Sequence, residues 1–210
     1  MPPSPLDTAA QRCHAVAFAV ALSAGTPLAP KRYERELLAL FEAGVLDLDE
    51  VDELLDRSIY QVLYHSCAPQ PPSEADLQAL LAQAEDYNAR HQITGLLLYS
   101  AGRYVQVLEG AQADVQALYA RIRRDPRHEQ VVTVSEGPGP QRHFAGWSMG
   151  FGHVAAPEVD QVLDAVQAPQ PPTRLRVDDA RLRTLLQAFA GPSLTGSHQP
   201  VTLPEQPRYA

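Results

Sequence analysis

Residues 86–110 carry the strongest structural pattern in the chain, and they read DYNARHQITGLLLYSAGRYVQVLEG. Leu96–Tyr99 is a continuous apolar run, which is typical of a strand buried on both faces. Ala101-Gly102 then predicts a tight turn into a second strand. On that second strand, period-two alternation places Gln106 on the same face as two large apolar neighbours. An unpaired buried amide costs ~1–3 kcal/mol, so Gln106 is expected to have a hydrogen-bond partner.

Two more polar side chains lie on patterns that should build a core. Ser73 and Asp76 have the spacing of a capping box, and the helical stripe that follows them ends at Asn88. In the apolar segment upstream of this helix, alternation places Tyr64 on a core-facing side. Tyr64, Asn88 and Gln106 would all be satisfied by a pocket that holds a planar ligand with amide-like edges.

Length and composition limit the class of protein. The chain has 210 residues, enough for one domain with extensions or for two small domains. A net charge of −8 and a pI near 5.3 argue against a nucleic-acid-binding surface. Cys13 and Cys67 lie far apart with no metal-type spacing, which favours a reducing compartment and predicts no metal site. The apolar run 15–22 is too short to cross a membrane, so we expect a cytoplasmic protein without membrane contact.

The positions of glycine, proline and helix-capping residues, together with changes in composition, predict four segments. The N-terminal segment should hold a helix over 7–23, a second helix that stops at Gly44 and a third that begins after Asp47. Such helices would pack on the next domain or on a second copy of the chain. The predicted segments are a helical extension (1–57), a compact domain (58–151), a helical cap (152–190) and a disordered tail (191–210).

The compact domain has the element order βαββαββ. Its predicted strands are 58–66, 94–100, 103–109, 130–137 and 146–151, and its predicted helices are 73–90 and 111–124. This order predicts an α+β fold, a ferredoxin-like sandwich with both helices on one sheet face. Right-handed crossovers place the first and third strands side by side, which makes Tyr64 and Gln106 neighbours. Two amphipathic helices, 157–167 and 177–189, are expected to cover the other face.

The compact domain resembles the BLUF domain, a blue-light receptor module that binds FAD. The resemblance covers less than half of the chain, and the flanking segments resemble no enzymatic output domain. Five pieces carry it, in the family's order and spacing: Val62–Ser66, Asn88–Tyr99, Gly102–Gly110, Ala120–His128 and Phe144–Gly150.

The resemblance implies a role for each of the three polar core residues. Tyr64 matches the redox-active tyrosine of the family. Gln106 matches the glutamine between that tyrosine and the N5/O4 edge of the flavin. Asn88 matches the asparagine that hydrogen-bonds the carbonyl edge of the isoalloxazine ring.

Five further residues are implied by the same resemblance. Arg121 and Asp125, at i and i+4 on the second helix, match residues that hold the flavin and its ribityl–phosphate side. His128 is implied to contact the cofactor. Trp147 and Met149 match a fifth-strand pair that reports the state of Gln106, and the sequence leaves open which of the two faces the flavin.

The implied mechanism is a light-driven electron and proton transfer from Tyr64 that changes the hydrogen bonds of Gln106 and leaves a red-shifted state. One rearranged hydrogen bond is worth only ~1 kcal/mol, so the output should be a population shift. We expect it to act through the fifth strand and the flanking helices on a partner protein or a second copy of the chain.

Two alternatives remain open from the sequence. The first is a light-independent interaction module of the same fold, with antitoxin-like N-terminal helices. The second, a small enzyme of the acylphosphatase type, is disfavoured because no phosphate-cradling loop follows the first strand. We therefore expect no enzymatic activity. Taken singly, Tyr64 and Trp147 could be core, Asn88 a helix cap, and Arg121 and Asp125 a surface pair.

Overall fold

A computed structural model describes residues 6, 8–168 and 175–190 of the chain. The tail predicted to be disordered, 191–210, lies outside the described residues. Contacts divide the chain into two compact units, which are Met1–Tyr60 with Gly137–Gln141 and Gln61–Glu136 with Arg142–Ala210.

The described residues of the first unit form three helices with clear local causes. A capping box of Thr8 and Gln11 begins α1 (Ala9–Ser23), and one of Asp47 and Glu50 begins α3 (Leu48–Asp56). Gly44 follows the C-cap of α2 (Arg32–Glu42) with a φ of +74°, the left-handed conformation that favours glycine. The small core of this unit is formed by Tyr33, Leu37, Phe41 and Val51.

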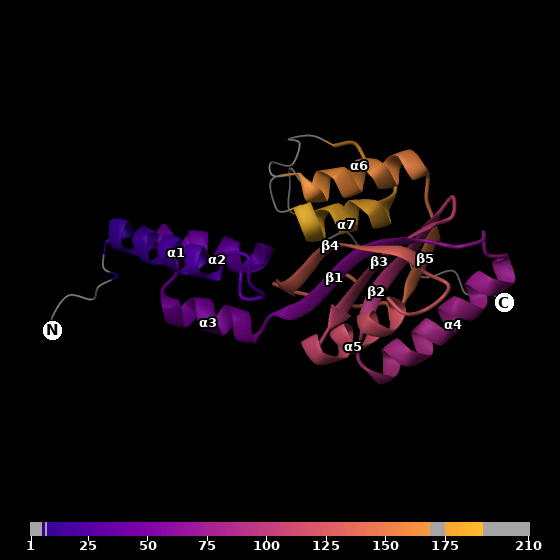
Figure 1. The fold of residues 1–210 in the computed structure, drawn as a ribbon, viewed down its shortest axis with the longest axis horizontal. Helices are drawn as coiled ribbons and strands as arrows, with labels where there is room; N and C mark the ends of the chain where they lie inside the picture. Colours follow the sequence, from indigo (N-terminus) through magenta and orange to yellow (C-terminus); the bar gives the residue numbers. More distant parts are fainter. Residues whose placement is uncertain (1–5, 7, 169–174, 191–210) are drawn as a thin grey trace. The chain divides into compact units, whose positions relative to one another are not determined.

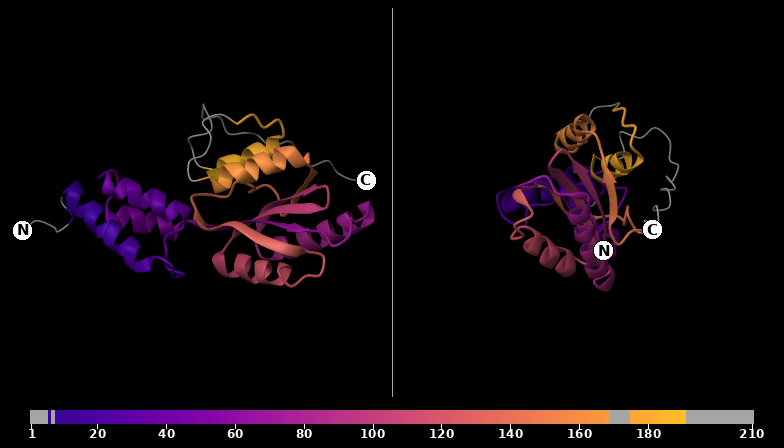
Figure 2. Two further views of the ribbon diagram at one scale, coloured as in Figure 1. Left: turned by 45° about the horizontal axis from the view of Figure 1, so that its top comes forward. Right: turned by 90° about the vertical axis from the view of Figure 1, so that its right-hand side faces the viewer.

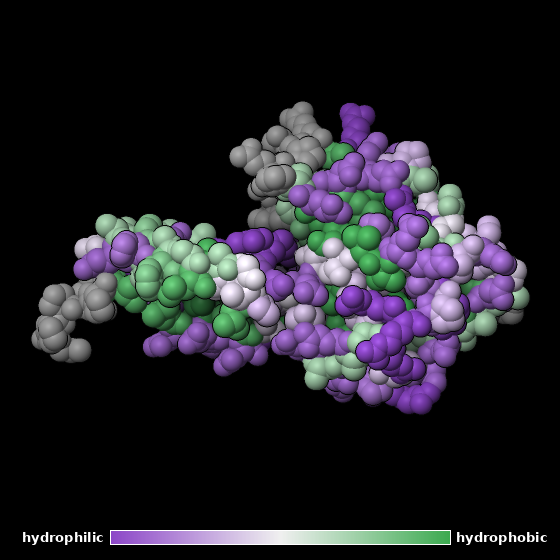
Figure 3. All heavy atoms as spheres, in the orientation of Figure 1, coloured by the Kyte–Doolittle hydropathy of each residue, from purple (hydrophilic) through white to green (hydrophobic). Residues whose placement is uncertain are grey.

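Helix α1 leaves apolar surface uncovered. None of its residues is buried, and the side chains of Phe18 and Leu22 are 62% and 68% exposed. The space-filling view shows hydrophobic residues gathered on this unit (Figure 3). A patch of this kind on a single chain is typical of an interaction surface.

In the described part of the chain, five strands form one sheet in the order β4-β1-β3-β2-β5 (Figure 1). The order confirms the α+β, ferredoxin-like prediction and the placement of the first and third strands side by side. The strands are β1 (Ile59–Cys67), β2 (Thr94–Ser100), β3 (Arg103–Gly110), β4 (Glu129–Gly139) and β5 (Gly150–His153), with helices α4 (Glu74–Arg90) and α5 (Gln112–Ile122) between them.

The β2–β3 hairpin is built as its sequence indicates. Ala101 and Gly102 have φ angles of 47° and 85°, and two positive values are what a type I′ turn requires. The register pairs Leu97 with Gln106, and β5 adds to the other edge of β2 in parallel. Gln106 therefore lies in the middle of the sheet, between β1 and β2.

The two faces of the sheet carry different helices, as Figures 1 and 2 show. Helices α4 and α5 lie on one face, and α6 (Ala156–Gln167) and α7 (Ala180–Ala190) lie on the other. The core under α6 and α7 joins sheet residues with helix residues, among them Leu63, Leu96, Leu98, Val105, Val107, Val159, Leu182, Leu185 and Phe189. This confirms that the last two helices cover the second face.

Several predicted boundaries are wrong, among them the start of α7, which lies at Ala180 rather than at residue 177, and two of them concern site residues. Strand β5 begins at Gly150 rather than at residue 146, so Trp147 and Met149 precede the strand. In that segment Trp147 N donates to Phe144 O in a turn (3.0 Å). Helix α5 ends at Ile122, and Asp125 lies in the turn that follows, with its N–H bonded to Ile122 O (3.0 Å). Pro126 explains this end, because a residue before proline is disfavoured in helical conformation.

Helices long and apolar enough to cross a membrane are absent from the described part of the chain.

Candidate functional site

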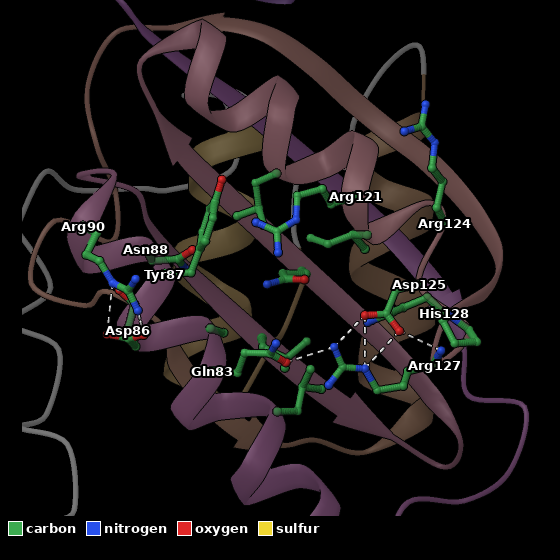
Figure 4. Close-up of a pocket in the computed structure, with 17 residues that line it drawn as sticks. Gln83, Asp86, Tyr87, Asn88, Arg90, Arg121, Arg124, Asp125, Arg127 and His128 are labelled. Atoms are coloured by element: carbon green, nitrogen blue, oxygen red, sulfur yellow. Dashed lines mark hydrogen bonds and ion pairs between the residues drawn. The ribbon is translucent and has the colours of Figure 1, made fainter.

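A pocket of about 500 Å³ opens between α4, α5 and the segment that follows α5, with residues of β2 and β3 at its base (Figure 4). This volume lies within the range of cofactor sites, roughly 300–1,000 Å³. The structure brings five of the sequence-predicted residues into its lining, namely Asn88, Gln106, Arg121, Asp125 and His128.

Tyr64 lies next to the pocket wall rather than in the lining. Its hydroxyl donates a hydrogen bond to Oε1 of Gln106, from the neighbouring strand. The side chain of Tyr64 is fully buried, and burial raises the pKa of its phenol well above the ordinary value. The phenol therefore keeps its proton at neutral pH and holds it against the amide oxygen of Gln106.

The other end of the Gln106 amide has a weak partner. Nε2 of Gln106 donates to Sδ of Met149 at 3.5 Å, and a thioether is a poor acceptor. Trp147 instead stacks with Phe144 at a centroid distance of 6.4 Å and packs against the core under α6 and α7. Of the two residues that the sequence could not separate, Met149 is the one that contacts Gln106.

Asn88 contributes an unpaired acceptor to the pocket. Its side chain is buried in the last turn of α4, and its Nδ2 donates to the backbone oxygen of Ser148 at 2.7 Å. Its Oδ1 is buried without a hydrogen-bond partner. A buried acceptor without a partner costs ~1–3 kcal/mol, so this atom fits a ligand that presents an N–H donor. Helix α4 is capped at His91, so Asn88 is not its cap.

Arg121 is held by aromatic contacts. Its guanidinium carbon lies 4.6 Å from the ring centroid of Tyr87, within the range of a cation–π contact (Figure 4). Tyr87 stacks on His91 at 4.3 Å, and Nδ1 of His91 lies 3.0 Å from the Asp114 carboxylate. Tyr87 was not among the predicted site residues, although its place beside Asn88 on α4 is a usable signal.

Asp125 pairs with Arg127 and not with Arg121. The carboxylate oxygen Oδ2 lies 2.6 Å from Nη2 of Arg127, and the hydrogen bonds from Arg127 lower the pKa of Asp125. The same guanidinium donates to Oε1 of Gln83 on α4 at 3.1 Å, which connects the two sides of the pocket (Figure 4). Arg127 and Gln83 were missed because exposed arginine and glutamine side chains are common on any surface.

His128 is a buried, neutral histidine. Its Nδ1 lies 2.8 Å from the hydroxyl of Ser66, and its ring lies 4.9 Å from that of Tyr104. Burial lowers the pKa of His128 to about 4, and the nearby Asp125 offsets this only in part.

This pKa predicts a dependence of stability on pH. The folded pKa of about 4 lies below the ordinary 6.5, so between these values the unfolded chain binds more protons. The contribution of the neutral His128 to stability is therefore complete above pH 6.5. As the pH decreases to 4, the free energy of unfolding falls by about 3 kcal/mol. Urea unfolding of the flavin-free protein at several pH values should show this loss, and His128→Gln should reduce its slope. If the free energy of unfolding fell equally with pH in the wild-type protein and in His128→Gln, the histidine would not be the cause.

Comparison with known proteins places this geometry in a family. The model of the BLUF family, described as sensors of blue-light using FAD, matches residues 59–150. The photoactivated adenylate cyclase subunit beta of Euglena longa is 42% identical over 95 residues, which are 45% of this chain and 11% of that protein. The blue light- and temperature-regulated antirepressor BluF of Escherichia coli (strain K12) is 31% identical over 90 residues, which are 43% of this chain and 22% of that protein.

Solved structures give matches of the same kind. The structure titled BlrP1 BLUF is 32% identical, with a TM-score of 0.41, over 45% of this chain and 64% of that one. The dark-state structure of BlrB, a BLUF protein, is 26% identical, with a TM-score of 0.48, over 61% of this chain and 96% of that one.

The chain thus spans about a tenth of the length of the first cyclase relatives, and the match is confined to the domain that holds the pocket. The family model and the relatives agree on that domain. Residues 59–150 belong to the BLUF family, whose members sense blue light with FAD as their cofactor.

Proposed function

We propose that this chain is a blue-light photoreceptor that binds FAD non-covalently in the pocket and signals through protein contacts in the cytoplasm. The observation that carries the proposal is the buried hydrogen bond from Tyr64 to Gln106, because Gln106 also lines the pocket. A tyrosine that holds its proton against an amide is arranged for coupled transfer of an electron and a proton.

The residues of the pocket fit the cofactor. The unpaired Oδ1 of Asn88 is an acceptor for the imide N–H of the isoalloxazine ring. Arg121, Asp125 and His128 also line the pocket, and we propose that they hold the flavin and its ribityl–phosphate side. Arg124 adds positive charge at the same place, which suits an anionic phosphate, whereas the charge of Arg127 is compensated by Asp125.

The photochemical step is assigned to Tyr64 and Gln106. When bound, FAD supplies an excited state that accepts an electron from Tyr64. The proton of Tyr64 then leaves Oη along its existing hydrogen bond to Oε1 of Gln106, in a place that burial keeps free of bulk water. The amide of Gln106 would then rotate or tautomerise, and its weak bond to Met149 is the bond it would give up most easily. The electron and the proton would return to Tyr64, so that the rearranged hydrogen bonds of Gln106 are the net change.

The change at Gln106 is small, so the output must be a shift between states of similar energy. One rearranged hydrogen bond contributes about 1 kcal/mol, which changes a population ratio by roughly fivefold. Met149 directly precedes β5, and Trp147 packs on the core under α6 and α7. We propose that β5 and these two helices form the relay, and that a partner protein or a second copy of the chain reads it.

We propose a sensor without enzymatic activity of its own. The match to the cyclase relative spans 11% of that protein, so the activity in its name is not proposed for this chain. The uncovered apolar surface of α1 is the observation that favours protein contacts as the output. The same surface supports the second candidate, a light-independent interaction module.

An absorption spectrum of the purified protein, in the dark and directly after blue light, tests the proposal. We expect a flavin band that shifts slightly to the red and returns in the dark. A protein that stays colourless after incubation with FAD would contradict the photoreceptor and leave the interaction module. Light scattering in both states would show whether the chain associates with itself, and the mass of a single chain throughout would exclude self-association.

A further inference from the structure

Glu109 is a buried carboxylate that no step of the proposed mechanism uses. Its side chain is fully buried on β3, three residues after Gln106, so alternation along the strand places the two side chains on opposite faces of the sheet. Glutamate is almost never fully buried without partners that compensate its charge. The partners of Glu109 therefore indicate what it does.

Four donors surround this carboxylate. Oε1 accepts from Nε2 of Gln61 at 3.0 Å and from the backbone N–H of His143 at 2.9 Å. Oε2 accepts from Oγ1 of Thr94 at 3.3 Å and from the backbone N–H of Phe144 at 2.9 Å. An ionised carboxylate has acceptor sites for all four donors, whereas an amide in its place does not. Burial raises the pKa of Glu109, and these hydrogen bonds oppose that effect.

Two of the four donors belong to the loop of residues 142–149, which connects β4 to β5. The same loop is held at its start by Arg142, whose guanidinium donates to Oγ1 of Thr94 and to the backbone oxygens of Glu109 and Gln92 at 2.7–2.9 Å. The start of the loop is thus held by the Glu109 carboxylate, on β3, and by the bonds of its own Arg142 to Thr94, Glu109 and Gln92.

The far end of the loop contacts the side-chain amides of Asn88 and Gln106. The backbone oxygen of Ser148 accepts from Asn88, and Sδ of Met149 accepts from Gln106. Between the two ends, the Gly95 N–H donates to the backbone oxygen of Trp147 at 3.1 Å. The placement of the loop therefore determines how these two acceptors meet the pocket amides.

We propose that Glu109 is a positioning residue, which anchors the 142–149 loop from the opposite face of the sheet and so sets the contacts of Met149 with Gln106 and of Ser148 with Asn88. The inference rests on the proposed role of Gln106 in light sensing. It assigns to Glu109 no contact with the cofactor. Its effect is on the energy difference between the two arrangements of Gln106.

Glu109→Gln tests the anchor because it keeps the shape of the side chain. The amide turns an N–H₂ group toward a donor, so at least one bond to the loop is lost. We expect amide hydrogen exchange of residues 143–149, measured by mass spectrometry in the dark, to become about tenfold faster. We also expect the rate of return of the dark spectrum after blue light to change by about threefold or more.

Gln61→Leu is the matched control. It removes one donor to the same carboxylate and leaves both bonds to the loop. The control should lower the melting temperature without changing loop exchange or spectral recovery. The proposal would be overturned if the two substitutions changed spectral recovery equally, or if recovery were unchanged in Glu109→Gln. In either case the role of Glu109 would be structural.

A second variant covers the case in which Glu109→Gln does not fold. Arg142→Met leaves the carboxylate and removes the other anchor of the loop. It should therefore change loop exchange and spectral recovery in the same direction as Glu109→Gln, and unchanged values would contradict the anchored loop.

If the wild-type protein shows no light-induced shift, the proposed photosensing fails. Loop exchange then decides the anchor by itself, since it does not depend on the photochemistry.

Discussion

Tyr64→Phe is expected to bind flavin and to lose the light-induced red shift completely. Phenylalanine keeps the ring and its contact with Tyr119, whose centroid lies 5.0 Å away. It lacks the hydroxyl that donates to Gln106, so neither the proton nor its path remains. The difference spectrum between dark and illuminated protein measures the loss. The variant should also unfold more easily by about 1–3 kcal/mol, because the buried Oε1 of Gln106 loses its donor.

Tyr119→Phe is the matched control for this prediction. Tyr119 is a neighbouring tyrosine, but its hydroxyl lies 2.7 Å from Oγ1 of Thr133 and not against Gln106. The control should keep the red shift. A full shift in Tyr64→Phe, or a loss of equal size in Tyr119→Phe, would show that the bond to Gln106 is not the photochemical element.

The sheet and its helices could be predicted because their causes are local. The apolar run Leu96–Tyr99 and the turn at Ala101-Gly102 define the hairpin within a few residues of sequence. Ser73 begins α4 through its bond with Asp76. The handedness of the crossovers then leaves one arrangement of the first and third strands, so the sequence predicts that Tyr64 and Gln106 are neighbours.

The start of β5 could not be predicted because its cause is distant in the sequence. Trp147 to Met149 alternate as strand residues do, and the pattern alone favours a strand from residue 146. In the structure their backbone and that of Phe144 are held by groups far upstream, which are Glu109, Gly95 and Asn88. Because these hydrogen bonds go to separate groups rather than to one neighbouring strand along its length, the segment forms a loop although its side chains alternate as in a strand.

Some residues of the candidate site could also be predicted from local sequence patterns, and others could not. Asn88 and Gln106 stand out because an amide on an apolar stripe needs a partner, and the structure places both at the pocket. Arg127 has no such pattern in the sequence. Its ion pair with Asp125 and its bond to Gln83 depend on how the segment after α5 packs against α4. Glu109 is similar, because an acidic residue at a strand end normally indicates exposure to solvent.

Gln106→Leu is the second substitution with a complete expected loss. Leucine fits the buried position between Tyr104 and Leu108 but removes both the acceptor for Tyr64 and the donor to Met149. We expect flavin to bind, since Asn88 and the basic residues of the pocket remain. No reversible red shift should follow blue light, because leucine has no hydrogen bond to exchange. Absorption spectra before and after illumination measure this directly.

Met149→Leu separates the switch from its partner. It leaves Gln106 and Tyr64 intact and removes the weak acceptor of the amide, so the shift should persist while the rate of dark recovery changes. A shift that survives in Gln106→Leu would mean that Tyr64 acts without an amide bridge. If Met149→Leu abolished the shift as completely as Gln106→Leu, the sulfur contact would be part of the photochemistry itself. The expected difference between the two variants therefore locates the boundary between the reaction, at Tyr64 and Gln106, and the relay, which begins at Met149.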